Sequence, residues 1–203
     1  MARVAIFVSG GGTNLQAIID ASKRGLLANA NISLVVSSNE NAYALKRADE
    51  AGIESCVVSR KSFSEGSEFD KALVDACKSA NIDIIVLAGY LCVLGSTFIA
   101  EYRDRIINVH PSLIPSFCGE GYYGLRVHEA AIQRGVKVTG ATVHIVNEIC
   151  DGGPILAQKA VEVKTTDTPE TLQRRVMEQA EWVLLPRILQ EVCSRFDKGE
   201  PIY

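Results

Sequence analysis

The sequence predicts an α/β fold, a doubly wound and mostly parallel sheet with helices on both faces and a C-terminal β-hairpin plus helix. Short β-branched runs alternate with helical patterns through the first half of the chain, and this alternation is typical of strand–helix crossovers. Several of the strand-like runs are apolar at nearly every position, which indicates burial on both faces of the sheet. In such a sheet, ligands bind at the carboxyl ends of the strands.

The elements of the first half can be assigned in chain order. Hydrophobic periodicity predicts three helices, at residues 15–26, 44–51 and 69–80, and five strands, at residues 4–8, 32–36, 55–58, 82–88 and 106–109. The N-terminal apolar stretch runs into three glycines with no cleavage signal behind it, so we assign a strand there and not a signal peptide. The longest apolar run, 84–94, is about half of the roughly 20 residues that a membrane-spanning helix needs. We expect no membrane segment.

The pattern changes after His110. A loop rich in Pro, Gly and Tyr precedes a helix at 127–134, and two extended runs, 139–146 and 154–163, predict a hairpin-like pair. The last helix is expected to start at a cap formed by residues 167–170 and to be kinked or broken by Pro186. No linker or shift in composition divides the chain, so we predict one domain over 1–203.

Charge and cysteine content exclude several classes of protein. The chain of 203 residues carries 21 Lys and Arg against 24 Asp and Glu, a net charge of −3, which excludes a polycationic nucleic-acid coat. Its 6 cysteines form no C-x-x-C pair, a pattern that fits reduced thiols in a cytoplasmic protein. We therefore expect small-molecule partners, with no nucleic acid, no membrane and no metal.

The first candidate site is the segment Ser9–Asn14, between the first strand and the first helix. Its three glycines allow backbone N–H groups to face an anion at the positive end of a helix, which favours a monophosphate site. A tight turn with an asparagine cap is the alternative. Dinucleotide binding is disfavoured because Leu15 occupies the third glycine position of that motif and Ser37 and Ser38 stand where an acidic residue is usual.

The second and third candidate sites are polar groups in the C-terminal half. Asn108 and His110 end a buried strand and point to the same side of it, so both can donate hydrogen bonds to a carbonyl oxygen that becomes tetrahedral. A capped strand end with a satisfied histidine is the alternative. Asp151 opens an Asp-Gly-Gly-Pro turn, and it can also raise the pKa of a neighbouring histidine and accept a proton. His144 lies inside an expected strand, where packing or a supporting hydrogen bond is the expectation.

Five segments together closely resemble the phosphoribosylglycinamide formyltransferases, a folate-dependent family. They are residues 9–18, 86–90, 108–115, 140–144 and 151–155, with the sequences SGGGTNLQAI, VLAGY, NVHPSLIP, GATVH and DGGPI. They occur in the family's order and span nearly the whole chain. The Asn-x-His-Pro-Ser and Asp-Gly-Gly segments are also shared with the wider formyltransferase-like group.

The resemblance implies an activity and a set of site residues. The activity is transfer of the formyl group of 10-formyltetrahydrofolate, a co-substrate, to the amine of glycinamide ribonucleotide in purine biosynthesis, without a metal. The implied catalytic residues are Asn108, His110 and Asp151. The implied contacts of the acceptor substrate are Gly12, Thr13 and Asn14 with the phosphate, and Glu181. The implied walls of the folate pocket are Leu91, Cys92, Val93, Leu94, Asn108, Asn147 and Asp151. The resemblance thus implies a phosphate-binding half at about 1–107 and a catalytic and folate-binding half at about 108–203.

Some features leave alternatives open. Certain relatives place an arginine near position 66, where this chain has Gly66, and the loop 116–124 is either a lid or an oligomer contact. Both a monomer and a homodimer are compatible with the sequence. The rival functions are a formyltetrahydrofolate hydrolase or another formyltransferase-like enzyme, and a non-catalytic nucleotide-binding domain.

Overall fold

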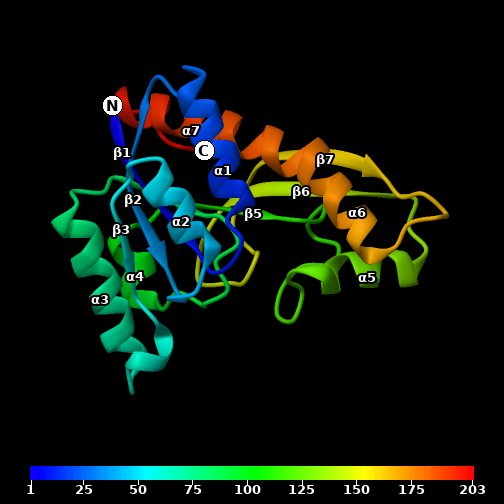
Figure 1. The fold of residues 1–203 in the computed structure, drawn as a ribbon, viewed down its shortest axis with the longest axis horizontal. Helices are drawn as coiled ribbons and strands as arrows, with labels where there is room; N and C mark the ends of the chain where they lie inside the picture. The colour runs from blue at the N-terminus through cyan, green and yellow to red at the C-terminus, as the bar shows by residue number, and fades with distance from the viewer.

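The computed structural model describes all 203 residues and contains one seven-stranded sheet. The strand order is β3-β2-β1-β4-β5-β6-β7, with helices on both faces (Figure 1). The strands are β1 (Ala2–Val8), β2 (Ala30–Ser37), β3 (Ser55–Val57), β4 (Ile84–Leu87), β5 (Ile106–His110), β6 (Val138–Ile145) and β7 (Ile155–Glu162). The α-helices are α1 (Thr13–Lys23), α2 (Tyr43–Glu50), α3 (Gly66–Ser79), α4 (Ser96–Glu101), α5 (Leu125–Arg134), α6 (Pro169–Val176) and α7 (Trp182–Asp197), with a 3-10 turn η1 (Arg60–Ser62) and a π-helical turn η2 (Met177–Glu181). The predicted α/β class is confirmed.

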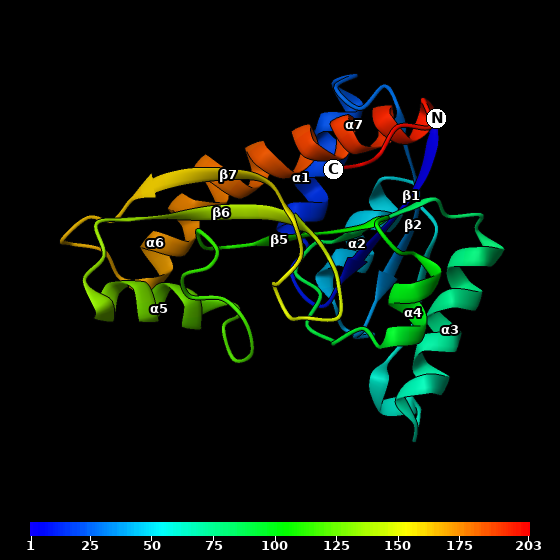
Figure 2. The same cartoon turned by 180° about the vertical axis from the view of Figure 1, so that it is seen from behind.

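Strand β1 is the centre of the parallel part and separates two hydrophobic cores. Its side chains alternate, so that Val4, Ile6 and Val8 enter one core while Ala5 and Phe7 enter the other. The larger core packs against α1, α2, α6 and α7, and the smaller one against α3 and α4. Figures 1 and 2 show α3 and α4 on the opposite side of the sheet from α1 and α7. Burial on both faces explains why these strands are apolar throughout.

The last two strands form the predicted hairpin-like pair. Strand β6 runs antiparallel to both β5 and β7. The two long strands extend away from the parallel part together with α5 and α6 (Figure 2). The register places Asn108 of β5 opposite His144 of β6, and His110 opposite Thr142. None of the helices is both long and apolar enough to cross a membrane.

The C-terminal helical segment corrects one prediction. Helix α6 begins as expected, because the Thr168 hydroxyl accepts a hydrogen bond from the Thr171 N–H. The prediction that Pro186 breaks the helix is wrong, since α7 continues through it to Asp197. Pro186 lies near the start of α7, and the carbonyl that lacks its donor belongs to Trp182, the first residue of that helix. The irregularity lies one turn earlier, in η2, which ends at Glu181.

Helix α4 is short, was not predicted, and is held in place by a residue of α3. The carboxylate of Asp70, which is buried, accepts hydrogen bonds from the backbone N–H groups of Gly95 at 3.0 Å and Phe98 at 3.4 Å. Asp70 therefore provides the hydrogen-bond acceptors for N–H groups at the start of α4. An N-cap residue usually has this role, but here the acceptor comes from a neighbouring helix. A side chain at position 95 would collide with this carboxylate and displace it, which glycine avoids.

We expect Asp70→Ala to lower the free energy of unfolding by about 1–3 kcal/mol, because two N–H groups of α4 lose their acceptor. Urea unfolding followed by circular dichroism measures this change. Asp75→Ala is the matched control: it removes a carboxylate from the exposed side of the same helix and should change stability by less than about 0.5 kcal/mol. Equal effects of the two substitutions would show that Asp70 does not cap α4.

Candidate active site

Polar groups gather at the carboxyl ends of β1, β4 and β5, as predicted for this sheet. The hydroxyl of Ser9, just after β1, accepts a hydrogen bond from the backbone N–H of Leu91, which follows β4, at 2.8 Å. The same hydroxyl lies 2.6 Å from the hydroxyl of Ser38, which follows β2. Ser9 therefore links the ends of three strands, and the loops that leave them start from fixed positions.

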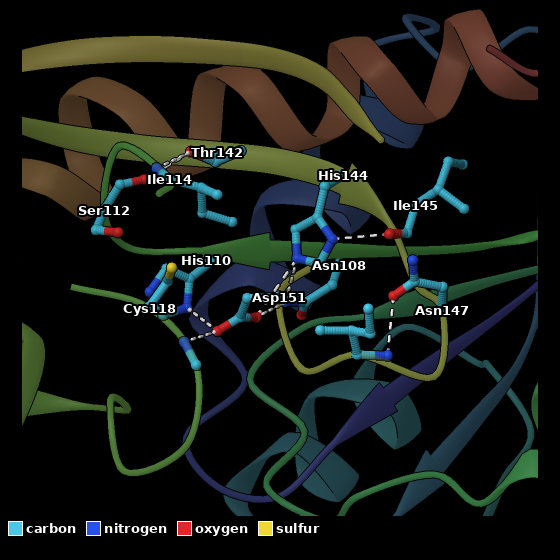
Figure 3. Close-up of polar contacts among 12 residues, drawn as sticks. Asn108, His110, Ser112, Ile114, Cys118, Thr142, His144, Ile145, Asn147 and Asp151 are labelled. Atoms are coloured by element: carbon cyan, nitrogen blue, oxygen red, sulfur yellow. Dashed lines mark hydrogen bonds and ion pairs between the residues drawn. The ribbon is translucent and has the colours of Figure 1, made fainter. Parts of the chain in front are cut away.

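The carboxylate of Asp151 is at the centre of the site (Figure 3). It comes from the loop between β6 and β7, and its side chain is only 10% exposed. The backbone N–H of Gly119 donates to Oδ2 at 2.8 Å, and Asn108 Nδ2 donates to Oδ1 at 3.5 Å. His110 Nδ1 lies 3.4 Å from Oδ2, and His144 Nε2 lies 3.5 Å from Oδ1. The three residues predicted to be catalytic, Asn108, His110 and Asp151, are therefore brought together.

His144 is a fourth member of this cluster. Its Nδ1 lies 2.8 Å from the carbonyl oxygen of Ile145, and because a carbonyl only accepts, Nδ1 must carry a proton. In the neutral ring Nε2 is then an acceptor, and Asn108 Nδ2 donates to it at 3.1 Å. The sequence left packing and support as alternatives for His144, and the geometry favours support. The β5–β6 register that places it opposite Asn108 has no local sequence signal.

Both ring nitrogens of His110 face acceptors. Nε2 lies 2.8 Å from the carbonyl oxygen of Phe117 and therefore carries the proton of the neutral ring. The unprotonated Nδ1 then faces the Asp151 carboxylate, so a proton placed between these two groups is attracted by both. The loop 116–124 thus contacts the site twice, through the carbonyl of Phe117 and the N–H of Gly119.

Burial and neighbouring charges set the pKa values of the pair. Burial lowers the pKa of His110 below its usual value, and the charge of Asp151 opposes this shift without cancelling it. The charge of Asp151 therefore raises the pKa of His110, as expected, but burial outweighs this effect. Burial acts to raise the pKa of Asp151, but its contact with His144, the charge of His110 and the Gly119 N–H together hold it below the ordinary value. At neutral pH, an ionised Asp151 thus faces a neutral His110.

The glycine loop forms an open surface at the start of α1. Gly12 adopts the left-handed conformation, with φ of 69°, and a side chain there would collide with Ala44 of α2. At Gly10 and Gly11, by contrast, an added Cβ would meet no atom within 4 Å. The space above these two glycines is therefore free for a ligand, and the N–H groups at the beginning of α1 are available to an anion.

Asn14 and Glu181, which are distant in sequence, are in direct contact. Asn14 Nδ2 donates to Glu181 Oε2 at 2.7 Å, and both side chains are buried. The side chain of Asn14 thus points to Glu181, and its own Oδ1 is buried without a hydrogen-bond partner. Burial raises the pKa of Glu181 to about 7, while the hydrogen bond from Asn14 opposes the shift.

The residues expected to line a folate pocket differ in exposure. Leu91 is 62% exposed and Val93 is 86% exposed, so both present apolar surface just beyond β4 that suits a flat ring. Cys92 is half-buried, whereas Leu94 is buried and belongs to the smaller core. Asn147 shapes its own loop, because its Oδ1 accepts from the Ile149 N–H at 3.0 Å.

Position 66, where certain relatives carry an arginine, begins helix α3 in this chain. The guanidinium of Arg60 lies beside Gly66, 4.0 Å from where a Cβ would stand. The same guanidinium donates to the carbonyl oxygen of Phe63 at 2.7 Å. A cation is therefore present near position 66, although it comes from a different residue.

Comparisons with known proteins agree with this arrangement. Residues 2–188 match the family model described as formyl transferase. The phosphoribosylglycinamide formyltransferase of Haemophilus influenzae is 40% identical over 94% of this chain and 86% of its own length. The human trifunctional purine biosynthetic protein adenosine-3 is 42% identical over 95% of this chain, which spans only 18% of that longer protein.

The solved structures give the same result. The crystal structure of phosphoribosylglycinamide formyltransferase from Bacillus halodurans has a TM-score of 0.88 and 39% identity, and the match covers 96% of each chain. Sequence and fold thus agree over almost the full length. The chain therefore belongs to the formyl transferase family, and within it to the phosphoribosylglycinamide formyltransferases.

Proposed function

We propose that this chain transfers the formyl group of 10-formyltetrahydrofolate to the amine of glycinamide ribonucleotide, in purine biosynthesis. The observation that carries the proposal is the convergence of Asn108, His110 and Asp151 at the same strand ends as an open glycine loop. The relatives' names add support, since they include phosphoribosylglycinamide formyltransferase and a purine biosynthetic protein. The chain acts as one domain, 1–203, in the cytoplasm, on two small molecules and without a metal.

Asn108 stabilises the oxygen that becomes negative when the amine attacks the formyl carbon. One of its N–H groups is fixed by His144 at 3.1 Å, and the other makes only a long contact of 3.5 Å with Asp151. A substrate oxygen can replace that long contact at little cost. An N–H held in place before the reaction is the kind of donor that stabilises a tetrahedral adduct.

His110 and Asp151 move the proton. Attack forms the new C–N bond and leaves the amine nitrogen positively charged, so this nitrogen must lose a proton before the adduct collapses. The neutral His110 and the ionised Asp151 can together accept it, because a proton between them is attracted by both groups. They then give it to the folate nitrogen as its bond to the formyl carbon breaks.

The two substrates are held on either side of this cluster. The N–H groups of Gly12, Thr13 and Asn14 receive the phosphate at the positive end of α1. Glu181 contacts the rest of the acceptor. Backbone and side chains at residues 91–94, 108 and 147–151 form the folate pocket, in which Leu91 and Val93 supply apolar surface. Holding both reactants supplies much of the rate gain of a two-substrate transfer.

We expect Asn108→Ala to reduce kcat by at least about 100-fold, because removal of one oxyanion donor costs about 10²–10³ in rate. We expect His110→Ala to reduce kcat by at least about 100-fold as well, because a positioned general acid–base contributes about 10²–10⁴. The change in folate absorbance during turnover measures this effect. Both variants should keep a cooperative thermal unfolding transition, which separates loss of chemistry from loss of folding. A rate near that of the unsubstituted enzyme in either variant would remove that residue from the mechanism.

The reaction itself is tested by incubating the purified protein with 10-formyltetrahydrofolate, with and without glycinamide ribonucleotide. We expect folate to be consumed only when the acceptor is present, with a formyl group gained by the acceptor in its mass spectrum. Consumption without the acceptor would indicate a hydrolase. Binding of the ribonucleotide with no folate consumed would indicate a non-catalytic binding domain.

Glu181 should make stability depend on pH. Its raised pKa means that the folded state binds a proton more tightly than the unfolded state, so the contribution of Glu181 to stability is greatest at low pH and falls as the pH rises from about 4.5 to about 7. The slope contributed by one such group is at most about 1.4 kcal/mol per pH unit. We expect Glu181→Gln to remove this contribution. Urea unfolding at several pH values measures it, and an unchanged pH dependence in the variant would show that Glu181 has the same pKa in the folded and unfolded states.

A further inference from the structure

The glycine loop is held from behind by helix α2. The backbone N–H of Ala44, in the first turn of α2, donates to the carbonyl oxygen of Gly10 at 3.1 Å. Nε of Arg47, one turn later, donates to the carbonyl oxygen of Gly11 at 2.8 Å. Two consecutive carbonyls of the loop therefore point toward α2.

The direction of these carbonyls fixes the direction of the next two N–H groups. In a trans peptide, C=O and N–H point in opposite directions. Because the carbonyls of Gly10 and Gly11 face α2, the N–H groups of Gly11 and Gly12 face away from it. The open space above Gly10 and Gly11 gives an anion access to this side of the loop.

Arg47 is itself oriented by its neighbours. Nη1 donates to Gln16 Oε1 of α1 at 2.8 Å, and the guanidinium lies 5.0 Å from the centre of the Tyr43 ring. Gln16 in turn donates its backbone N–H to the carbonyl of Gly12 at 2.9 Å. One planar guanidinium thus ties the loop to the first turn of α1, and a lysine amine offers no such fork of donors.

We infer that Arg47 is a positioning residue for the phosphate of the acceptor substrate: through the Gly11 carbonyl it aims the loop's N–H groups at that phosphate. The inference rests on the proposed phosphate site at Gly12, Thr13 and Asn14. Arg47 acts on the affinity of the loop for phosphate and not on the formyl transfer.

The test compares Arg47→Met and Arg47→Lys with the unsubstituted enzyme. Arg47→Met should raise KM for glycinamide ribonucleotide by roughly tenfold or more, the effect of losing one hydrogen bond from a charged group, while kcat and KM for the folate change by less than about threefold. Arg47→Lys should recover only part of the loss, because it keeps the charge and not the fork. With the riboside that lacks the phosphate as acceptor, Arg47→Met and the unsubstituted enzyme should give the same kcat/KM.

Lys46→Met is the matched control. It removes the same charge from the adjacent position of α2, where the side chain is exposed and pairs with Glu50 at 3.8 Å, and it should leave both KM values unchanged. Four outcomes would overturn the inference. Arg47→Met could lower kcat/KM equally for the ribonucleotide and the riboside, lower kcat alone, have the same effect as Lys46→Met, or have no effect. Calorimetry measures binding of the ribonucleotide to the same variants without turnover. If the protein has no transferase activity, the proposed function is refuted, and the binding comparison still decides the role of Arg47.

Discussion

The site depends on the need to neutralise one buried carboxylate. Asp151 is nearly inaccessible to water, so its charge must be compensated by hydrogen bonds and by partly positive neighbours. Its partners come from three separate segments: Asn108 and His110 from β5, His144 from β6, and Gly119 from the loop before α5. Moving any one of these segments would leave a buried charge with fewer donors. The geometry of the cluster is therefore enforced by electrostatics, and the catalytic groups are preorganised before substrate arrives.

The sheet positions the groups that neutralise the charge of Asp151. Parallel strands β1, β4 and β5 end at one edge, which brings the glycine loop, the exposed apolar residues after β4, and Asn108 close to one another. The reversal of direction at β6 then adds a histidine opposite Asn108. The loop after β6 folds back so that Asp151 meets both strands (Figure 3). The change from parallel to antiparallel pairing is thus what completes the site.

The sequence predicts the features of this structure that have a local pattern and does not predict the contacts between distant segments. Alternating apolar runs predict the sheet, and the i, i+2 spacing of Asn108 and His110 predicts that they share a side, because both patterns are local. The β5–β6 register, the contact of Asn14 with Glu181 and the capping of α4 by Asp70 depend on tertiary packing and leave no periodic signal. Pro186 misled the prediction for the same reason: whether a proline breaks a helix depends on where the helix starts, and the π-helical turn moved that start to Trp182.

Burial alone does not decide whether a carboxylate is charged, and two buried carboxylates of the site, Asp151 and Glu181, differ for that reason. Burial raises the pKa of both, but Asp151 faces several donors and its pKa falls below the usual value, whereas Glu181 has one donor, Asn14, and its pKa rises to about 7. An ionised group is what the proton transfer at His110 requires. A carboxyl with a pKa near neutrality can instead donate to or accept from a polar substrate group, or ionise against a cationic amine, at little cost in free energy. The number of donors around each carboxylate thus assigns one to proton transfer and the other to recognition.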